Sequence, residues 1–101
     1  MIDRNLYTGL IRLHLLHHAA EGPIFGQAMI DELGRHGYRL SAGTLYPILH
    51  GMERQGYLRS RLTLNGGRNR RVYRATPAGR KALVIARQRV QVLFGEMFEH
   101  D

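Results

Sequence analysis

The sequence predicts one small domain of the mainly α, α+β class, in which three helices, a two-stranded hairpin and a fourth helix follow one another. Apolar residues recur at helical spacing in four segments, and another segment alternates around an Asn-Gly turn as a β-hairpin does. The length of 101 residues suits a single domain. A chain this short buries only about two-thirds of its unfolded surface, so a second copy of the chain would usefully extend its core.

The first two helices are expected over residues 3–20 and 26–36. The first carries so many leucines, with Ile11 beside them, that its apolar surface exceeds a normal amphipathic stripe and must be covered on two sides. The segment Glu21-Gly22-Pro23 ends this helix. Gly37 is placed to end the second helix in a left-handed conformation.

The third helix is expected over residues 41–55, with Ser41 in the capping position and Gly56 closing the helix. Its buried stripe follows the spacing i, i+3, i+4, i+7 and consists of Leu45, Ile48, Leu49 and Met52. The opposite face is unusual because it contains glycine and proline, which weaken a helix interior. That face consists of Gly43, Pro47, His50 and Arg54, with Thr44, Tyr46 and Gly51 beside it.

The hairpin is expected over residues 57–75. Side chains alternate from Leu58 to Thr63, and the turn at Asn65-Gly66-Gly67 contains one of the strongest short hairpin signals. The chain then returns as a strand from Arg70 to Ala75. The segment after the turn is too charged to be buried and is expected to project as a loop; it consists of Arg68, Asn69, Arg70 and Arg71.

The last helix is expected to follow Thr76, which caps it, with Pro77 in the first helical position and Phe98 near its end. Its apolar residues have the 3-4-3-4 spacing of a coiled-coil seam. Both terminal helices are more apolar than a monomer of this size can cover, which favours a homodimer. In the alternative interpretation, the last helix only covers the three-helix body. The predicted dimer interface consists of Leu6, Leu10, Leu83, Ala86, Val90, Leu93 and Met97.

The charge of the chain indicates the class of its partner. Fifteen basic residues against eight acidic ones give +7, and from Arg54 to Gly95 there are eleven basic residues and no acidic one. Arginine pairs with phosphate through a planar fork and also reads guanine edges. A field of one sign is typical of a protein with a polyanionic partner. A merely solvated basic surface is the alternative.

The order helix, helix, helix, basic hairpin, helix is that of a winged helix-turn-helix domain. Residues 1–76 would then form a DNA-binding domain, and residues 77–101 a dimerisation helix, joined in one compact unit. The third helix would enter the major groove of double-stranded DNA, where a glycine lets the backbone approach closely. The predicted DNA-binding residues are Ser41, Gly43, Thr44, Tyr46, Pro47, His50 and Arg54 in the helix and Gly67, Arg68, Asn69, Arg70 and Arg71 in the wing.

The same residues also have a purely structural interpretation. Gly43 and Pro47 could serve only to shape a turn, and Tyr46 could pack on the second helix. Two functions from other classes stay open as well: an RNA-binding winged helix, and a protein-interaction module whose basic wing only keeps the surface soluble.

The recognition-helix segment resembles the signature of the PadR family of transcription factors. The similarity is carried by Ser41-Ala42-Gly43-Thr44-Leu45-Tyr46-Pro47-Ile48-Leu49, by Gly56-Tyr57-Leu58, and by Val72-Tyr73-Arg74-Ala75-Thr76-Pro77-Ala78-Gly79 at the junction of wing and last helix. The resemblance implies a homodimeric repressor of a pseudo-palindromic operator, dimerised through its first and last helices. It also implies that Thr44, Tyr46 and Pro47 face DNA and that residues 66–71 contact the adjacent backbone or minor groove. A single helix after the wing is similar to the short subgroup of this family.

Other classes of site find little support in the sequence. The absence of cysteine excludes a disulfide and a thiolate metal site. His14, His17 and His18 have the spacing i, i+3, i+4, but Glu21 is the only acid close to them in sequence, so a structural or interface role is favoured over a metal site. No catalytic arrangement and no phosphate-binding glycine loop stands out, which predicts no enzyme activity and no cofactor.

The expected location is the cytoplasm, because no apolar run approaches the roughly 18 residues of a membrane span and the first residues do not open a signal peptide. A small-molecule effector is a further partner of such a regulator, and the sequence does not identify its chemistry. The sign of regulation, repression, follows from the family resemblance alone.

Overall fold

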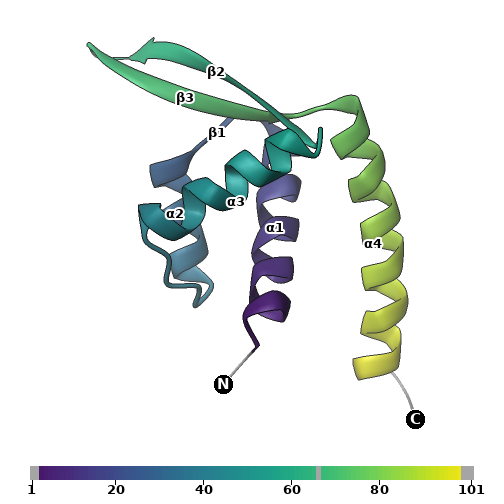
Figure 1. Ribbon diagram of the computed structural model, residues 1–101. Coiled ribbons are helices and arrows are strands. Elements are labelled where there is room, and N and C mark those ends of the chain that lie inside the picture. Colours follow the sequence, from purple (N-terminus) through teal and green to yellow (C-terminus); the bar gives the residue numbers. More distant parts are fainter. Residues whose placement is uncertain (1–2, 66, 99–101) are drawn as a thin grey trace.

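The computed structural model describes residues 3–65 and 67–98, without the side chains of Asn65 and Arg68. Within these residues the chain forms four helices and three strands (Figure 1). They are α1 (Arg4–Glu21), β1 (Ile24–Phe25), α2 (Gly26–Arg35), α3 (Ala42–Arg54), β2 (Leu58–Asn65), β3 (Arg68–Ala75) and α4 (Pro77–Phe98). The predicted mainly α class and the winged helix-turn-helix order are confirmed.

The ends of the helices follow local capping chemistry. Asp3 caps α1, where its carboxylate accepts a hydrogen bond from the Leu6 backbone N–H at 3.1 Å. Gly37 lies directly after α2 with a φ of 90°, as its position predicted. Thr76 caps α4 as expected, because its hydroxyl accepts a hydrogen bond from the Gly79 N–H at 3.0 Å.

The start of α3 agrees with the expected helix over residues 41–55. The helix begins at Ala42, directly after Ser41, and Pro47 lies inside it. Pro47 has no N–H to donate to the carbonyl of Gly43, four residues earlier. Ser41 occupies the N-cap position, but its hydroxyl bonds the Thr44 hydroxyl at 3.4 Å and makes no capping bond to the backbone.

The sheet has three antiparallel strands in the order β1-β3-β2, one strand more than the predicted hairpin. Strand β1 pairs Ile24 with Tyr73 and Phe25 with Val72. Two residues carry no periodic signal of their own, so β1 exists only because the folded chain brings it to the free edge of β3.

The wing also differs from the expected loop. Strand β3 begins at Arg68, and the register runs without interruption from the pair Asn65–Arg68 to the pair Leu58–Ala75. Residues 68–71 therefore belong to a strand. They still project, because the hairpin leaves the helices and passes over α2 (Figure 1). Gly67 has a φ of 79°, a turn conformation that glycine adopts without strain. Gly66, the centre of the predicted turn, lies outside the described residues.

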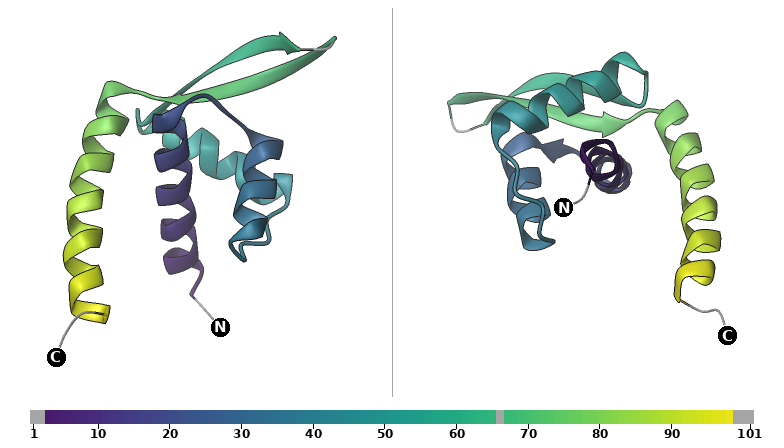
Figure 2. Two further views of the ribbon diagram at one scale, coloured as in Figure 1. Left: turned by 180° about the vertical axis from the view of Figure 1, so that it is seen from behind. Right: turned by 60° about the horizontal axis from the view of Figure 1, so that its bottom comes forward.

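The core lies where α1, α2, α3 and the base of the sheet meet. The view from behind shows α1 standing between α4 and the pair α2–α3 (Figure 2). The predicted stripe of α3 is confirmed, because Leu45, Leu49 and Met52 are buried and Ile48 is half-buried. The other fully buried large side chains are Ile11, Leu15, Leu33, Leu58 and Tyr73.

Helix α4 packs on this body mainly through its beginning. Gly79 and Leu83 are its buried residues, and a Cβ at Gly79 would stand 2.2 Å from the Tyr57 carbonyl oxygen, so this close approach requires glycine. Within residues 3–65 and 67–98, no helix combines the length and the apolar composition needed to cross a membrane.

Candidate nucleic-acid interface

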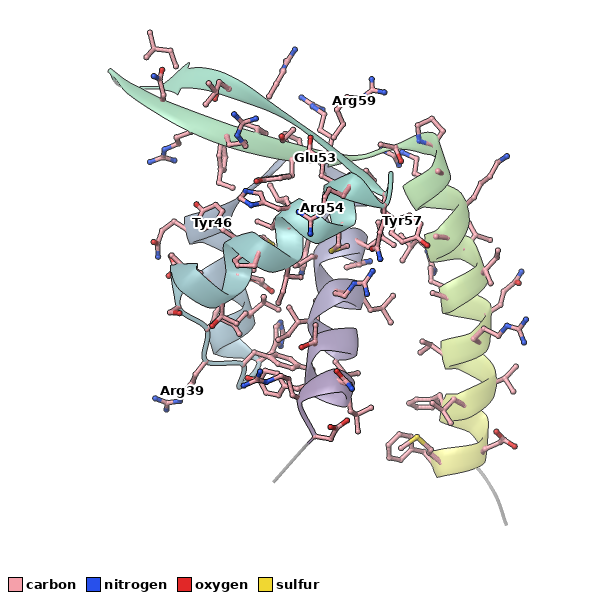
Figure 3. All side chains as sticks on the ribbon, viewed as in Figure 1. Arg39, Tyr46, Glu53, Arg54, Tyr57 and Arg59 are labelled. Carbon is pink, nitrogen blue, oxygen red and sulfur yellow. The ribbon has the colours of Figure 1, made fainter. Side chains whose placement is uncertain are left out.

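The predicted recognition face of α3 is open to solvent. Helix α3 lies across the front of the molecule beneath the sheet, with Arg54 on its front (Figure 3). Six of the seven residues of this face that were predicted to bind DNA are exposed: Ser41, Gly43, Thr44, Pro47, His50 and Arg54. The seventh, Tyr46, is half-buried. The buried stripe thus anchors the helix, and the opposite face is left free for a contact outside the chain.

Tyr46 packs on the second helix, as the structural interpretation had it. A Cβ built at Gly26 would stand 2.2 Å from the Tyr46 phenol oxygen, so the ring fills the space that Gly26 leaves at the start of α2. Its other side remains accessible, and the ring of His50 lies 6.3 Å away, one turn further along α3. Gly26 is a site residue that the sequence did not reveal, since nothing local distinguishes it from a helix start.

Gly43 is not required by the packing of this chain. A Cβ there would meet only the Ser41 hydroxyl oxygen, at 3.7 Å, and the backbone has no left-handed φ. Glycine costs about 0.5–1 kcal/mol relative to alanine inside a helix. Neither sterics nor conformation within the chain therefore explains the residue, and its position is open to solvent.

A polar network fixes the end of α3 to the hairpin. The Glu53 carboxylate accepts hydrogen bonds from the Ser60 backbone N–H at 3.0 Å and from the Ser60 hydroxyl at 2.9 Å. Arg71 donates to the same hydroxyl at 3.0 Å. Figure 3 shows Glu53 pointing from α3 towards the strands. Burial, followed by the charge of Glu53, raises the pKa of the Tyr73 phenol, which therefore stays neutral. The network holds the recognition face and the wing in one orientation.

The outer face of the sheet is an arginine surface that the sequence did not single out. Residues directly opposite one another on paired strands point to the same face of the sheet. Every second residue along one strand also points to the same face. The register pairs Arg59 with Arg74, Arg61 with Val72 and Thr63 with Arg70, which places four arginines on one face. We call them the outer-face arginines: Arg59, Arg61, Arg70 and Arg74. In the sequence, the spacing of two residues between Arg59 and Arg61 was the signal that could have indicated this face.

The outer-face arginines lack an internal counter-charge. In the part of the chain that the structure describes, no ion pair involves an arginine of the hairpin; the ion-paired arginine is Arg35 in α2. Arg59 and Arg74 stand directly opposite each other, an arrangement of like charges that destabilises a sheet. Arg70 lies over the Phe25 ring at 5.4 Å, which holds it near β1. An anion outside the chain would relieve the repulsion.

The predicted wing residues fall into two groups. Arg70 is on the outer face, whereas Arg71 and Asn69 alternate with it and lie on the other face, where Arg71 takes part in the Glu53 network. Arg71 therefore has a structural role in addition to its predicted one. Gly67 is exposed at the turn, and the side chain of Arg68 lies outside the described residues.

A second surface of different character lies between α1 and α4. It is a groove of about 980 Å³ whose lining is half apolar, with Leu10, Leu13, Leu83, Val84, Val90 and Phe94, and half polar, with His14, His17, Glu21, Arg87, Gln88 and Gln91. Of the predicted dimer residues, Leu6, Leu10, Val90, Leu93 and Met97 are between 40% and 58% exposed. Leu83 is 8% exposed and belongs to the core of its own chain, and Ala86 is half-buried.

Comparisons with known proteins agree with this geometry. A family model described as the transcriptional regulator PadR-like family matches residues 15–84. The chain is similar to the transcriptional regulator Rv3488 of Mycobacterium tuberculosis, with 50% identity over 94 residues, which is 93% of this chain and 88% of that protein.

Solved structures of similar fold are also described as transcriptional regulators. A PadR family transcriptional regulator from Eggerthella lenta matches with a TM-score of 0.77 and 31% identity, over 96% of this chain and 88% of that one. A putative transcriptional regulator from Thermoplasma acidophilum, TA0346, matches with a TM-score of 0.76 and 27% identity, over 98% of this chain and 99% of that one.

Proposed function

Because the chain belongs to the PadR-like family of transcriptional regulators, we propose that it is a homodimeric repressor that binds double-stranded DNA at a pseudo-palindromic operator. One observation carries the proposal at the level of residues. The exposed face of α3, with a glycine that the fold does not require, lies beside a sheet whose outer-face arginines make no ion pair within the described residues. Such a surface fits a polyanion that can be approached closely.

In the proposed complex, α3 lies in the major groove, which is about 12 Å wide. Gly43 lets the first turn approach the DNA, where Ser41 and Thr44 offer hydroxyls to phosphates or base edges. The exposed N–H groups of this turn favour negative charge. Pro47 offers an apolar surface to a thymine methyl group, and His50 and Arg54 extend the contact along the same face.

The wing supplies affinity in this proposal. In this proposal Arg70, with Gly67 and Asn69 near the turn, meets the DNA backbone or the adjacent minor groove. The contact predicted for Arg68 rests on the sequence alone. The outer-face arginines Arg59, Arg61 and Arg74 extend this basic surface towards the base of the hairpin. The Glu53–Ser60–Arg71 network supports the proposal because a fixed angle between α3 and the wing lets both engage one duplex without reordering.

The dimer is proposed from the groove between α1 and α4. A second copy of α4 would cover groove residues such as Leu10 and Val90 and also the exposed Leu93 and Met97. Residues 77–101 would thus dimerise the chain while residues 1–76 bind DNA. Two copies of α3 would then enter successive major grooves about 34 Å apart, as a pseudo-palindromic operator requires.

The experiment is a binding titration on the DNA upstream of the protein's own gene, at two salt concentrations, with scrambled duplex as competitor. With ~6–10 phosphate contacts, affinity is expected to fall by roughly 10³–10⁵ between 50 and 200 mM salt, and the upstream site is expected to survive the competitor. If scrambled duplex competes equally well, the repressor proposal is wrong.

Structured RNA as a competitor in the same assay distinguishes a DNA-binding protein from an RNA-binding one. A DNA-binding protein should bind RNA poorly, because the deep narrow groove of A-form RNA does not admit α3. A protein-interaction module would show no affinity for either nucleic acid.

A further inference from the structure

The last turn of α1 carries a polar cluster that the DNA-binding proposal does not use. His17, His18 and Glu21 each offer a ligand atom, and these atoms lie within 4.8 Å of one another. Nε2 of His17 is 3.6 Å from Oε2 of Glu21, and Nδ1 of His18 is 3.8 Å from Oε1 of the same carboxylate. With metal–ligand distances of ~2.0–2.2 Å, neighbouring ligands of tetrahedral zinc are about 3.3–3.6 Å apart. The three side chains are thus already close to ligand spacing.

A carboxylate from the next helix lies on the other side of the His18 ring. Nε2 of His18 lies 3.9 Å from Oε2 of Glu32 in α2. Glu32 is itself fixed, since it accepts hydrogen bonds from Arg35 and from Nε2 of His36, the latter at 3.0 Å. A metal-ligating histidine usually directs its second ring nitrogen to such a carboxylate, which fixes its tautomer.

The position of the cluster favours a cation. The three residues lie at the C-terminal end of α1, where the helix dipole carries partial negative charge. The side chains of His17 and Glu21 are 49% and 64% exposed, so an ion reaches them from solvent, whereas His18 is 23% exposed and positioned between its two carboxylates. Three protein ligands leave the fourth position of a tetrahedral ion open to water.

His14 is close to this cluster and belongs to a different arrangement. Its ring stacks on His36 at 5.6 Å and meets the Tyr38 ring edge-on at 5.2 Å. Burial, followed by the charges of the other histidines, lowers the pKa of His14, which is therefore mainly neutral and serves as packing between α1 and α2.

We infer that His17, His18 and Glu21 bind one divalent transition metal ion of the Zn²⁺ type per chain, with Glu32 as the residue that positions His18. Two imidazoles and a carboxylate suit Zn²⁺ and its analogue Co²⁺, whereas Mg²⁺ and Ca²⁺ require oxygen ligands. The sequence disfavoured a metal here because Glu21 was the only acid nearby. The fold supplies the missing carboxylate, since α2 brings Glu32 to His18.

The test is a titration of the metal-free full chain with Co²⁺, followed by its visible d–d absorption, with Zn²⁺ as competitor and calorimetry for stoichiometry. One ion per chain is expected. His17→Ala and Glu21→Gln should each weaken binding by more than 100-fold, and Glu32→Gln, which removes only the positioning contact, by about 10–100-fold. His50→Ala is the matched control, because it removes an exposed histidine of α3 and should leave metal binding unchanged.

Two results would overturn the inference. One is the absence of saturable binding in the wild-type chain. The other is binding that persists in both His17→Ala and Glu21→Gln, or that depends on His14 instead. The side chains of His17, Glu21, Glu32 and His50 lie at the surface or nearly so, so their substitution should not disturb the fold. Circular dichroism verifies that each variant is folded. The titration contains no DNA, so its outcome is independent of the proposed DNA binding. His17 and Glu21 line the groove that the proposed dimer would use, so sedimentation of the metal-free chain separates a covered site from an absent one.

Discussion

Helices α3 and α4 each expose one face, and the two faces have opposite character. In α3 the same chain buries the apolar stripe except for the half-buried Ile48, and what remains outside is small, polar and basic. In α4 the chain buries only Gly79 and Leu83, and large apolar side chains stay exposed beside the charged ones, from Val84 at 57% exposed to Phe98 at 67%.

This difference shows which contacts the chain provides for itself. An apolar face of this extent is rare on a soluble monomer unless a partner covers it. A basic face with a dispensable glycine implies a partner too, but a charged and hydrated one. The proposed function accordingly gives the two helices different partners, a second apolar surface for α4 and a polyanion for α3, and substitutions on each helix should separate the two.

The largest effect is expected from a charge placed in the α1–α4 groove. Val90→Glu puts a carboxylate into the groove and the predicted seam, where a dimer would have to bury it. The variant should be monomeric in sedimentation, and because both half-sites are then bound independently, operator affinity should fall by about 10³-fold towards the non-specific level.

Val92→Glu is the matched control for this substitution. Val92 is 66% exposed, lies outside the predicted seam and does not line the groove. The same change only two residues away should leave the dimer and the DNA affinity intact. If both variants remain dimeric, the seam is wrong; if both dissociate, the interface covers more of α4 than the groove side.

A smaller effect is expected from the outer-face arginines. Replacing both Arg59 and Arg61 with alanine removes two cations from the proposed DNA surface, so the slope of log affinity against log salt should fall by about 2. Stability should not decrease, since Arg59 faces Arg74 and its removal relieves a like-charge pair. Titrations at several salt concentrations and a thermal melt measure the two quantities.

The control for the arginine pair is the double variant Lys81→Ala, Arg89→Ala. It removes the same net charge from exposed positions of α4. An equal loss of slope in both double variants would mean that the basic residues act only as a general field, and the outer face would have no contact of its own.

The parts of the fold that sequence reasoning predicted correctly are those with a local period or a local cap. The stripe from Leu45 to Met52 is buried because residues at helical spacing share a face whatever surrounds them. The Asn-Gly turn was sufficient to place the hairpin, and Thr76 to place the start of α4. In each case the determining residues are within a few positions of one another.

The parts that could not be predicted depend on contacts between distant segments. Strand β1 forms by pairing with β3, Tyr46 fills the space left by Gly26, and His18 meets Glu32 across two helices. The spacing of Arg59 and Arg61 was visible in the sequence. That they belong to a larger arginine surface could not be predicted, because this depends on the strand register that adds Arg74 to the same face.

The smallest expected effect is also the one that most directly separates folding from binding on α3. Gly43→Ala should raise the free energy of unfolding by about 0.5–1 kcal/mol, because alanine is favoured in a helix and its Cβ would meet only the Ser41 hydroxyl, at 3.7 Å. If α3 lies against DNA at this position, the added methyl group holds the backbone away, and operator affinity should fall by roughly tenfold, or about 1.4 kcal/mol. Gly34→Ala is the matched control, since a Cβ at this helical position of α2 would meet nothing within 4 Å. It should give the same gain in stability with unchanged affinity. A Gly43→Ala variant that is more stable and binds DNA as tightly as the wild type would show that the first turn of α3 does not approach the duplex, and Tyr46, Pro47 and His50 would lose their proposed contacts with it.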